Sequence, residues 1–312
     1  MTEAISHHEF RNQSATGCSF ILLTTCHLEN DGVADLLRLI ASEEATLRQS
    51  EVARLRHIVL LQGSSAKQCD DVRKQLPNWV ELISSEQALS SPAARNVMIR
   101  HLLDREPFDR SAIVGFPDDD AWYPEGGLAC VERHFQNPEL QLLLTRYGPS
   151  PAANQCADAF RPTLQQSLSR GACAAIFLRA GLLAELGGFH ELLGLGTMLR
   201  GGEDTEFVHR AFHRARGRTL CVPGTLVGHE AADPAKKAAY YEGGLAAIVA
   251  HSHVSAAARI ALIRKLAVGV ALVLTRRMSA RQYFRSLKRA WAHAPDLRSF
   301  EGRPGTDRTG SQ

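Results

Sequence analysis

The sequence lacks any apolar run long enough to cross a membrane and any cysteine spacing typical of a structural zinc site. The longest uncharged apolar stretch, residues 266–275, has ten residues, whereas a spanning helix needs about twenty. The seven cysteines include no C-x-x-C pair. We therefore expect no disulfide framework and no zinc site, but reduced, mostly buried thiols in a cytosolic protein. The first seventeen residues are polar, so they do not predict a signal peptide.

Several common catalytic motifs are also absent. The sequence contains no glycine-rich phosphate loop, no serine elbow and no H-E-x-x-H motif, which argues against the enzyme classes that depend on them. Of the 312 residues, 45% are apolar and 22% are charged, as in soluble globular proteins, so collagen-like and disordered classes are excluded for most of the chain. The length predicts roughly two domains, or one large domain with an appendage.

Acidic residues are missing from one long segment, residues 243–295, which contains nine lysines and arginines. The whole chain has a net charge of +3 and residues 296–312 are neutral, so residues 1–242 carry −6. Apolar and aromatic residues alternate with these cations at helical spacing: Ile260, Ile263, Leu266, Val270, Tyr283, Phe284 and Trp291. The pattern predicts basic amphipathic helices over residues 254–295 that bind an anionic membrane surface through residues 259–291. A basic helical pair packed on a catalytic body is the alternative.

Apolar runs and helical patterns alternate in the first half of the chain. Residues 19–25, 57–62 and 111–116 have the pattern of buried strands, and segments with apolar residues at helical spacing separate them. This order predicts an α/β fold with a doubly wound, mostly parallel sheet flanked by helices. A strand pair near residues 220–222 and 226–228 is expected to close the globular part. Such sheets bind ligands beyond the carboxyl ends of their strands, so the residues after each strand are the first candidates for function.

Three adjacent carboxylates, Asp118, Asp119 and Asp120, directly follow the strand predicted at residues 111–116. Adjacent carboxylates repel one another unless a cation or solvent screens them. A hard divalent cation with oxygen ligands would remove that repulsion, so we expect Mg²⁺ or Mn²⁺ here. A solvated acidic turn is the alternative, but the position at the end of a central strand favours a functional site.

A second acidic group begins a helix predicted over residues 203–216. Glu203 and Asp204 lie four residues before the first apolar residues of this helix, so they extend its inward stripe by one turn. Glu206 is expected to point into solvent. Acids at a helix start are also stabilised by the helix dipole alone, which is the alternative. Two inward carboxylates nevertheless suit a cleft in which one acts as a general base.

Two single residues complete the set of candidates. His229 follows a predicted strand, where it is able to help the carboxylates hold a cation, although a lone histidine is more often structural. Arg95 lies early in a predicted helix. Its guanidinium suits forked contacts with phosphate oxygens, and a solvated surface arginine is the alternative.

The motifs follow one another in a defined order. The chain reads S-P-A-A-R-N, then F-x-D-D-D-x-x-x-P, then G-G-F, then G-E-D-x-E-F and finally a histidine after a strand. This order resembles that of the family 2 glycosyltransferases with the GT-A fold, and the resemblance covers about residues 17–253.

The resemblance implies a role for each candidate. It implies that Asp204 is the catalytic base, with Glu203 beside it. It implies that the cation, Mg²⁺ or Mn²⁺, is bound by Asp118, Asp120 and His229. It implies that the donor nucleotide is contacted by Thr25, Gln62, Arg95, Asp118 and Asp119.

The chain departs from the family pattern at two places. Family members usually carry a proline and an aromatic–asparagine pair after the first strand, where this chain has residues 24–27, T-T-C-H. They also carry an acid at the end of the second strand, where this chain has Gln62. The amide of Gln62 both donates and accepts hydrogen bonds, so it is still able to contact a pyrimidine edge.

The expected activity is inverting, metal-dependent transfer of a sugar from a nucleotide-sugar donor. The acceptor would be a hydroxyl of a membrane-linked glycan or lipid carrier in surface polysaccharide synthesis. A metal-dependent nucleotidyltransferase is one alternative, although residues 24–32 lack the lysine or arginine of a phosphate-gripping loop. A non-catalytic relative that binds membrane or nucleic acid through its basic tail is another, although the intact acidic motifs argue against it.

The expected organisation has five parts. A polar N-terminal extension covers residues 1–16, a nucleotide-binding half covers 17–123 and an acceptor half covers 124–253. Basic amphipathic helices follow over residues 254–295, and a flexible tail over 296–312. We expect a cytoplasmic protein, held peripherally on the inner face of the membrane, without a specific nucleic-acid partner.

Overall fold

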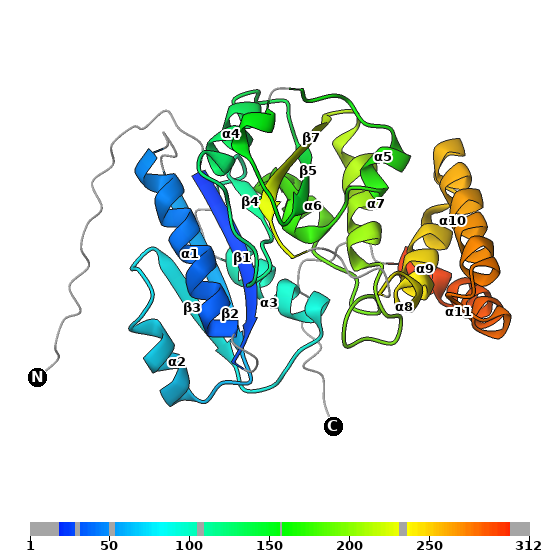
Figure 1. Cartoon of the computed structure of the whole chain (residues 1–312), viewed down its shortest axis with the longest axis horizontal. Helices are drawn as coiled ribbons and strands as arrows, with labels where there is room; N and C mark the ends of the chain where they lie inside the picture. The colour runs from blue at the N-terminus through cyan, green and yellow to red at the C-terminus, as the bar shows by residue number, and fades with distance from the viewer. Residues whose placement is uncertain are drawn as a thin grey trace, which may run out of the picture.

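The structure is a computed structural model (Figure 1). It describes residues 19–28, 32–49, 54–104, 109–156, 158–230 and 236–299. The predicted N-terminal extension, residues 1–16, lies outside the described residues.

The strands of the described residues are β1 (Ser19–His27), β2 (Arg54–Gln62), β3 (Val80–Ser85), β4 (Ile113–Gly115), β5 (Leu142–Gly148), β6 (Ile176–Arg179) and β7 (Thr219–Gly228). They form one seven-stranded sheet in the order β3-β2-β1-β4-β6-β5-β7. Neighbouring strands are parallel, except that β6 is antiparallel to both β4 and β5. The predicted mostly parallel sheet of an α/β fold is therefore confirmed.

The helices of the described residues are α1 (Gly32–Gln49), α2 (Ala66–Arg73), α3 (Ser91–Leu103), α4 (Gly127–Phe135), α5 (Leu164–Leu168), α6 (Ala180–Leu186), α7 (Glu203–Ala215), α8 (Lys236–Ala239), α9 (Tyr241–His251), α10 (Ala256–Leu274) and α11 (Ala280–Arg298). Two short 3-10 segments are η1 (Ala153–Cys156) and η2 (Cys173–Ala175). The predicted helix at the second acidic group is confirmed as α7.

Each face of the sheet buries its own set of apolar side chains. Phe20 and Leu22 of β1 pack with residues of α1 and α4, whereas Ile21 and Leu23 pack with residues of α3, α6 and α7. Successive residues of a strand point to opposite faces, so a continuous apolar run predicts a strand covered on both sides. Helices accordingly flank the sheet on both faces (Figure 1).

The topology brings several candidate segments to one edge of the sheet. β4 and β7 run in the same direction, so Asp118 and His229, which follow these strands, lie at the same edge. β6 runs the opposite way, so Cys173, which precedes its first residue by three positions, lies at this edge as well.

The predicted strand pair near residues 220–222 and 226–228 is wrong, because one strand, β7, covers both segments. Pro223 interrupts the apolar pattern and suggests a break. β7 is the last strand of the sheet, and its register against β5 shifts between Leu144 and Arg146. An edge strand with such an irregularity tolerates a proline.

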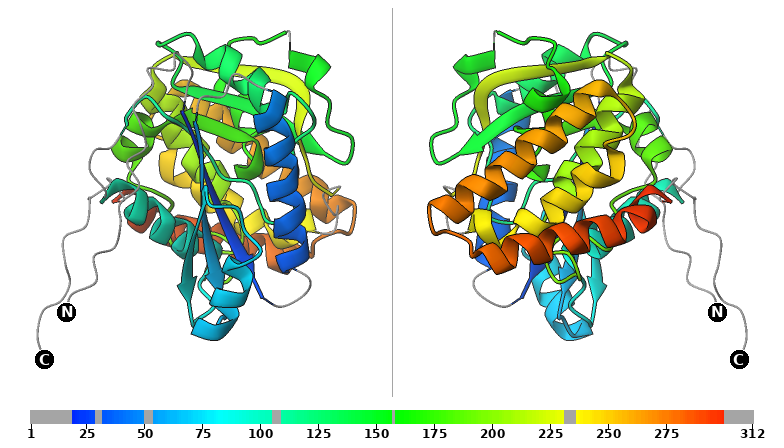
Figure 2. Two further views of the ribbon diagram at one scale, coloured as in Figure 1. Left: turned by 90° about the vertical axis from the view of Figure 1, so that its left-hand side faces the viewer. Right: turned by 90° about the vertical axis from the view of Figure 1, so that its right-hand side faces the viewer.

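The C-terminal helices pack on the rest of the molecule. Buried residues of α9 and α11 share one apolar cluster with Leu193 and Leu199, and Figure 2 (right) shows α9, α10 and α11 together on one side of the molecule. Arg289 of α11 forms an ion pair with Glu242 of α9 (2.6 Å) and donates to the carbonyl oxygen of Met198 (2.9 Å). No helix among the described residues combines the length and apolar character needed to span a membrane.

The predicted flexible tail over residues 296–312 begins too early, because Asp296–Arg298 form the last turn of α11. Pro295 lacks a backbone N–H and is a reason to expect the helix to end there. The helix continues because Leu297 is buried and Arg298 donates to the carbonyl oxygen of Ala250 (3.0 Å). Residues 300–312 lie outside the described residues.

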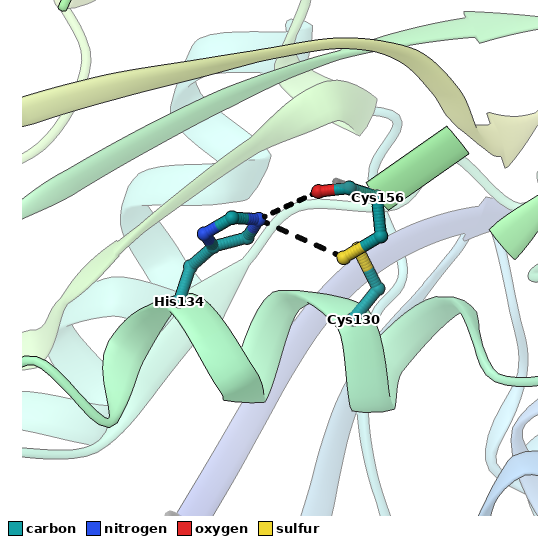
Figure 3. Close-up of a disulfide and its surroundings, with 3 residues drawn as sticks. All are labelled: Cys130, His134 and Cys156. Carbon is teal, nitrogen blue, oxygen red and sulfur yellow. Dashed lines mark hydrogen bonds between the residues drawn. A yellow bond between two sulfur atoms is a disulfide. The ribbon is translucent and has the colours of Figure 1, made fainter. Parts of the chain in front are cut away.

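Cys130 and Cys156 form a disulfide bond, so the prediction of reduced thiols is wrong for this pair (Figure 3). Nε2 of His134 lies 3.6 Å from Sγ of Cys156. The two cysteines are 26 residues apart, and sequence spacing alone does not reveal such a pairing. The remaining cysteines of the described residues are free and buried, as predicted: Cys26, Cys69, Cys173 and Cys221.

Candidate active site

A cavity of about 1230 Å³ lies at the edge of the sheet where Asp118, Cys173 and His229 come together. Its lining includes five of the predicted site residues: Asp118, Asp120, Glu203, Asp204 and His229. They come from the segment after β4, the start of α7 and the segment after β7. The structure therefore brings the catalytic and metal-binding candidates together in one place.

Hydrogen bonds fix the backbone on both sides of the aspartate triplet. The hydroxyl of Thr24 on β1 donates to the carbonyl oxygen of Pro117 (2.8 Å), and Nε2 of His57 lies 2.8 Å from that hydroxyl. After the triplet, Trp122 and Gly228 exchange two backbone hydrogen bonds (3.0 and 2.7 Å). A Cβ at Gly228 would collide with the ring of Trp122, so this contact requires glycine at the end of β7.

Asp118, Asp120 and His229 each offer one ligand atom within 4.8 Å of the others. Nε2 of His229 lies 3.2 Å from Oδ1 of Asp120 and 3.7 Å from Oδ2 of Asp118. The hydrogen bond with Asp120 raises the pKa of His229 to about 9 and lowers the pKa of Asp120. Carboxylate oxygens with one imidazole suit Mg²⁺ or Mn²⁺, so these residues fit the predicted cation.

Asp119 and Thr25 lie apart from this cluster. The Asp119 carboxylate lies beside Cys26 and Gly32, at the end of β1 and the start of α1. Burial, followed by the charges of its two neighbours, raises the pKa of Asp119 to about 6. Thr25 is half-buried at the end of β1, and neither residue lines the cavity.

Glu203 and Asp204 face the cavity from the first turn of α7, as predicted. Asp204 accepts hydrogen bonds from the backbone N–H (3.2 Å) and the thiol (2.7 Å) of Cys173. Burial raises the pKa of the Cys173 thiol well above its ordinary value, so the thiol keeps the proton that it donates. Burial and the adjacent Asp204 raise the pKa of Glu203 to about 7.

Arg95 links the two acidic groups. Its Nη2 lies 3.2 Å from Oδ1 of Asp118, and its Nη1 lies 3.9 Å from Oδ1 of Asp204. The side chain is buried, and Nη1 has no hydrogen-bond partner among the described residues. A buried donor without a hydrogen-bond partner is costly, so Nη1 of Arg95 is an exception that calls for an explanation.

Gln62 is not brought together with the other candidates. It is 1% exposed at the end of β2. Its Oε1 accepts from the backbone N–H of Leu89 (2.7 Å), and its Nε2 lies 3.3 Å from Nε2 of His27. Both ends of the amide therefore already have neighbours in the protein.

The prediction that Glu206 points into solvent is wrong, because this side chain is fully buried. Its carboxylate forms an ion pair with Arg210 (2.6 Å) and lies 3.0 Å from Nε2 of His251 on α9. Arg210 also donates to the carbonyl oxygens of Leu186 and Gly188 (both 2.7 Å). Glu206 therefore connects α7 with α9 and with the G-G-F turn.

Asn96, next to Arg95, holds the G-G-F turn against α3. Its amide donates to the carbonyl oxygen of Phe189 and accepts from the N–H of that residue, both at 2.8 Å. The Phe189 ring stacks on Phe207 of α7, with centroids 4.2 Å apart. Sequence reasoning missed the roles of Asn96 and Cys173, whose partners are 93 and 31 positions away. For Asn96, the sequence offered one indication: the S-P-A-A-R-N motif, which contains Asn96, occurs together with the G-G-F motif, which contains Phe189.

Comparison with models of known protein families finds no match, and comparison with curated protein sequences finds none either. Solved structures of S. aureus TarS do match. Residues 1–349 of TarS in complex with UDP-GlcNAc give a TM-score of 0.63 at 14% identity, over 91% of this chain and 89% of that one. The complex of the same fragment with UDP gives 0.60 at 13% identity over the same shares.

A longer TarS structure matches with a TM-score of 0.55 at 14% identity, over 75% of this chain but only 40% of the TarS chain. This chain therefore spans less than half of that protein. At these identities the likeness shows a shared fold, and it covers both the sheet and its flanking helices.

Proposed function

We propose that this chain is an inverting, metal-dependent glycosyltransferase of the family 2 type, which moves a sugar from a nucleotide-sugar donor to a hydroxyl of an acceptor. The observation that carries the proposal is a single cavity lined by Asp118, Asp120 and Asp204, with Arg95 in contact with both Asp118 and Asp204. TarS 1–349, which has the same fold, was solved with UDP and with UDP-GlcNAc. A uridine diphosphate sugar is therefore the first donor to test.

Asp204 is the proposed catalytic base. Its carboxylate removes the proton of the acceptor hydroxyl while that oxygen attacks the anomeric carbon of the donor. The bond between this carbon and the phosphate oxygen breaks, and the nucleoside diphosphate leaves with the bonding electrons. A single displacement of this kind inverts the anomeric configuration. Cys173 orients the carboxylate through two hydrogen bonds, and Glu203 lies beside it.

The proposed donor site extends from Arg95 towards β1 and β2. The Nη1 of Arg95, which lies 3.9 Å from Asp204 and has no hydrogen-bond partner among the described residues, suits an oxygen of the donor diphosphate. Asp118 contributes from the cavity, and Thr25 and Asp119 are the proposed contacts on the side of the nucleoside. Gln62 is buried with both ends of its amide next to protein atoms, so it would support this site from behind.

Asp118, Asp120 and His229 are the residues that would hold Mg²⁺ or Mn²⁺. When bound there, the cation would supply positive charge that stabilises the departing diphosphate. His229 must lose its proton to act as a ligand, since Asp120 keeps the imidazole charged up to about pH 9. Cation binding and protonation of His229 therefore compete.

The proposed acceptor is a membrane-linked glycan or a lipid carrier in surface polysaccharide synthesis, reached from the inner face of the membrane. Large apolar side chains are exposed on α10 and α11: Ile260, Ile263, Val268, Val270, Leu274, Phe284 and Trp291. The same helices lie in the segment with nine basic residues and no acid before Asp296. This combination suits the surface of an anionic membrane.

The test is the Asp204→Asn variant, with Asp71→Asn on the exposed surface of α2 as the matched control. The asparagine keeps the size of the side chain but is unable to take up the proton. We expect unchanged donor affinity by calorimetry and a transfer rate reduced by about 10²–10⁴-fold. The measurement is release of UDP from UDP-sugars in the presence of Mn²⁺ and acceptor.

Unchanged transfer by Asp204→Asn would contradict the assignment of the base. Release of a sugar 1-phosphate in place of UDP, as the UMP group moves to the acceptor, would instead favour a nucleotidyltransferase.

A further inference from the structure

The cavity has a second wall that the proposed transfer reaction does not use. Three cationic side chains line it: Arg146 on β5, Arg170 after α5 and Lys265 on α10. None of them forms an ion pair with another residue that the structure describes. At the opposite wall, Asp118, Asp120 and Asp204 have partners in Arg95 and His229. Glu203 and Glu230 also line the cavity, and no ion pair joins them to the three cations in the part of the chain that the structure describes. The three cations are therefore available to a ligand in the cavity.

Lys265 is half-buried, and no opposite charge pairs with its ammonium group among the described residues. Its Nζ lies over the ring of Tyr241, 5.2 Å from the centroid, and the Tyr241 hydroxyl donates to the backbone carbonyl of Lys265 (3.1 Å). Burial lowers the pKa of Lys265 to about 8. An ammonium group that is partly shielded from water is costly unless a partner of opposite charge binds to it.

Glycines bring Lys265 to this wall. A Cβ at Gly244 of α9 would lie 2.7 Å from Nζ of Lys265, so the absence of a side chain leaves room for the ammonium group. A Cβ at Gly202 would collide with the backbone of Gly243. Gly202 directly precedes Glu203, so this close contact holds α9 against the start of α7, which carries the candidate catalytic acids.

The two arginines extend the cationic wall towards the sheet. The guanidinium of Arg170 lies over the ring of Phe160 (5.4 Å), and its buried Nε has no hydrogen-bond partner among the described residues. Arg146 is exposed and precedes Tyr147, whose ring meets that of His229 edge-on at 5.2 Å. The wall therefore runs from the neighbourhood of the metal candidates to α10.

We propose that Arg146, Arg170 and Lys265 form a subsite for a phosphate or diphosphate ester carried by the acceptor. This inference rests on the proposed function, because it assigns the second wall of the same cavity to the second substrate. The donor diphosphate has its own partners in Arg95 and the metal candidates. At about 1230 Å³, the cavity exceeds the roughly 300–1,000 Å³ typical of a pocket for one small ligand, so it has room for both substrates.

The test is binding of phosphate esters to the full chain with its donor site filled by UDP and Mg²⁺. Calorimetry compares glucose 1-phosphate, farnesyl diphosphate and glucose on the wild type, on Lys265→Gln and on Lys288→Gln. Lys288 is the matched control, since it is exposed on α11 and does not line the cavity. Preference for farnesyl diphosphate indicates a lipid-linked acceptor, and preference for glucose 1-phosphate indicates a phosphate within a glycan.

We expect the wild type and Lys288→Gln to bind an ester more tightly than glucose. Lys265→Gln should bind that ester about tenfold or more weakly, with unchanged UDP affinity. Arg146→Gln, at an exposed position with little risk to folding, should weaken ester binding as well and replaces Lys265→Gln if that variant unfolds.

Equal ester binding by the wild type and Lys265→Gln, or no preference of the wild type for esters over glucose, overturns the proposal. A parallel loss of UDP affinity in Lys265→Gln overturns it too, because the lysine would then serve the donor. A wild type that does not bind UDP contradicts the proposed function instead, and the same titration without UDP still reports on the subsite.

Discussion

At the residue scale, a row of three histidines on α7 and α9 makes the fold sensitive to acid. His209 of α7 stacks between His213 and His251, with both centroid distances at 4.7 Å. Burial, followed by the charges of His251 and His213, lowers the pKa of His209 to about 3. Against the opposing effect of burial, Arg210 and His251 lower the pKa of Glu206 to about 2.

Both shifts predict loss of stability on acidification. Between pH 6.5 and 3 the unfolded chain binds a proton at His209 that the folded chain does not, so stability falls as the pH falls through this range. The stability that Glu206 contributes is present above its ordinary pKa of 4.5 and is lost as the pH falls towards 2. We expect His209→Phe to remove about 1.4 kcal/mol per pH unit from the slope of unfolding free energy between pH 6 and 5.

Urea unfolding at several pH values measures this slope, with the exposed His253→Gln as the control. An identical slope in the wild type and His209→Phe would show that His209 titrates normally in the folded protein.

The sequence predicted Asp204 and missed Glu206 for the same physical reason. Helical periodicity reports which face of α7 turns inward, and Asp204 lies on that face. Glu206 lies off that stripe and is buried because α9 covers its side of α7, with His251 45 positions away. A partner supplied by another element leaves no periodic signal in the sequence of α7.

At the element scale, α10 and α11 combine packing on the body with an exposed apolar surface. Ile263 and Leu274 of α10 are 66% and 77% exposed, and Phe284 of α11 is 66% exposed. Ala290 and Leu297 of α11 are buried in the apolar cluster that α11 shares with α9. Packing and the proposed membrane binding would therefore use different faces of the same pair of helices.

We expect the protein to bind vesicles of phosphatidylglycerol and phosphatidylcholine, and to bind phosphatidylcholine alone much more weakly. Replacing Ile263 and Phe284 together by serine should reduce binding by about tenfold or more, because each loses roughly 1.5–3 kcal/mol of apolar burial. Co-sedimentation with vesicles measures the effect, and a circular dichroism melt checks that the fold is retained. Equal binding of the two vesicle types would contradict an electrostatic attraction between the basic helices and anionic lipids.

Elements with simple apolar runs were predictable and those set by distant contacts were not. β1, β2 and β4 follow from continuous apolar runs, and α7 follows from its 3.6-residue period. The single strand β7 contains Pro223, which its edge position tolerates, and the last turn of α11 continues past Pro295 because Leu297 is buried. Local sequence carries no record of such tertiary contacts.

At the scale of the whole molecule, the acid-free segment of the sequence contributes Lys265 to the cationic wall of the cavity, and the body of negative net charge contributes Arg146 and Arg170. The acidic residues that face the cavity come from the body of negative net charge, whereas Lys265 comes from the acid-free segment. One of the predicted basic amphipathic helices, α10, therefore reaches the candidate active site. The sequence alone did not predict this, because the approach depends on backbone contact between glycines far apart in the chain.

The disulfide between Cys130 and Cys156 is the feature that a cytoplasmic location does not explain. Such bonds persist mainly in oxidising compartments. It joins α4 to η1, and neither cysteine lines the cavity. The bond therefore belongs to the scaffold that holds the site and takes no part in the proposed transfer.

The most direct test of the proposed function is a thermal-shift screen of nucleotide sugars, UDP-GlcNAc among them, with and without Mn²⁺. A ligand raises the melting temperature only if it binds the native state, and one at about 100 times its Kd adds roughly 2.7 kcal/mol. We predict a rise of several degrees with at least one nucleotide sugar, dependent on Mn²⁺ and absent in Asp118→Ala. No shift with any nucleotide sugar, or an equal shift in Asp118→Ala, would contradict a donor site at the aspartate triplet.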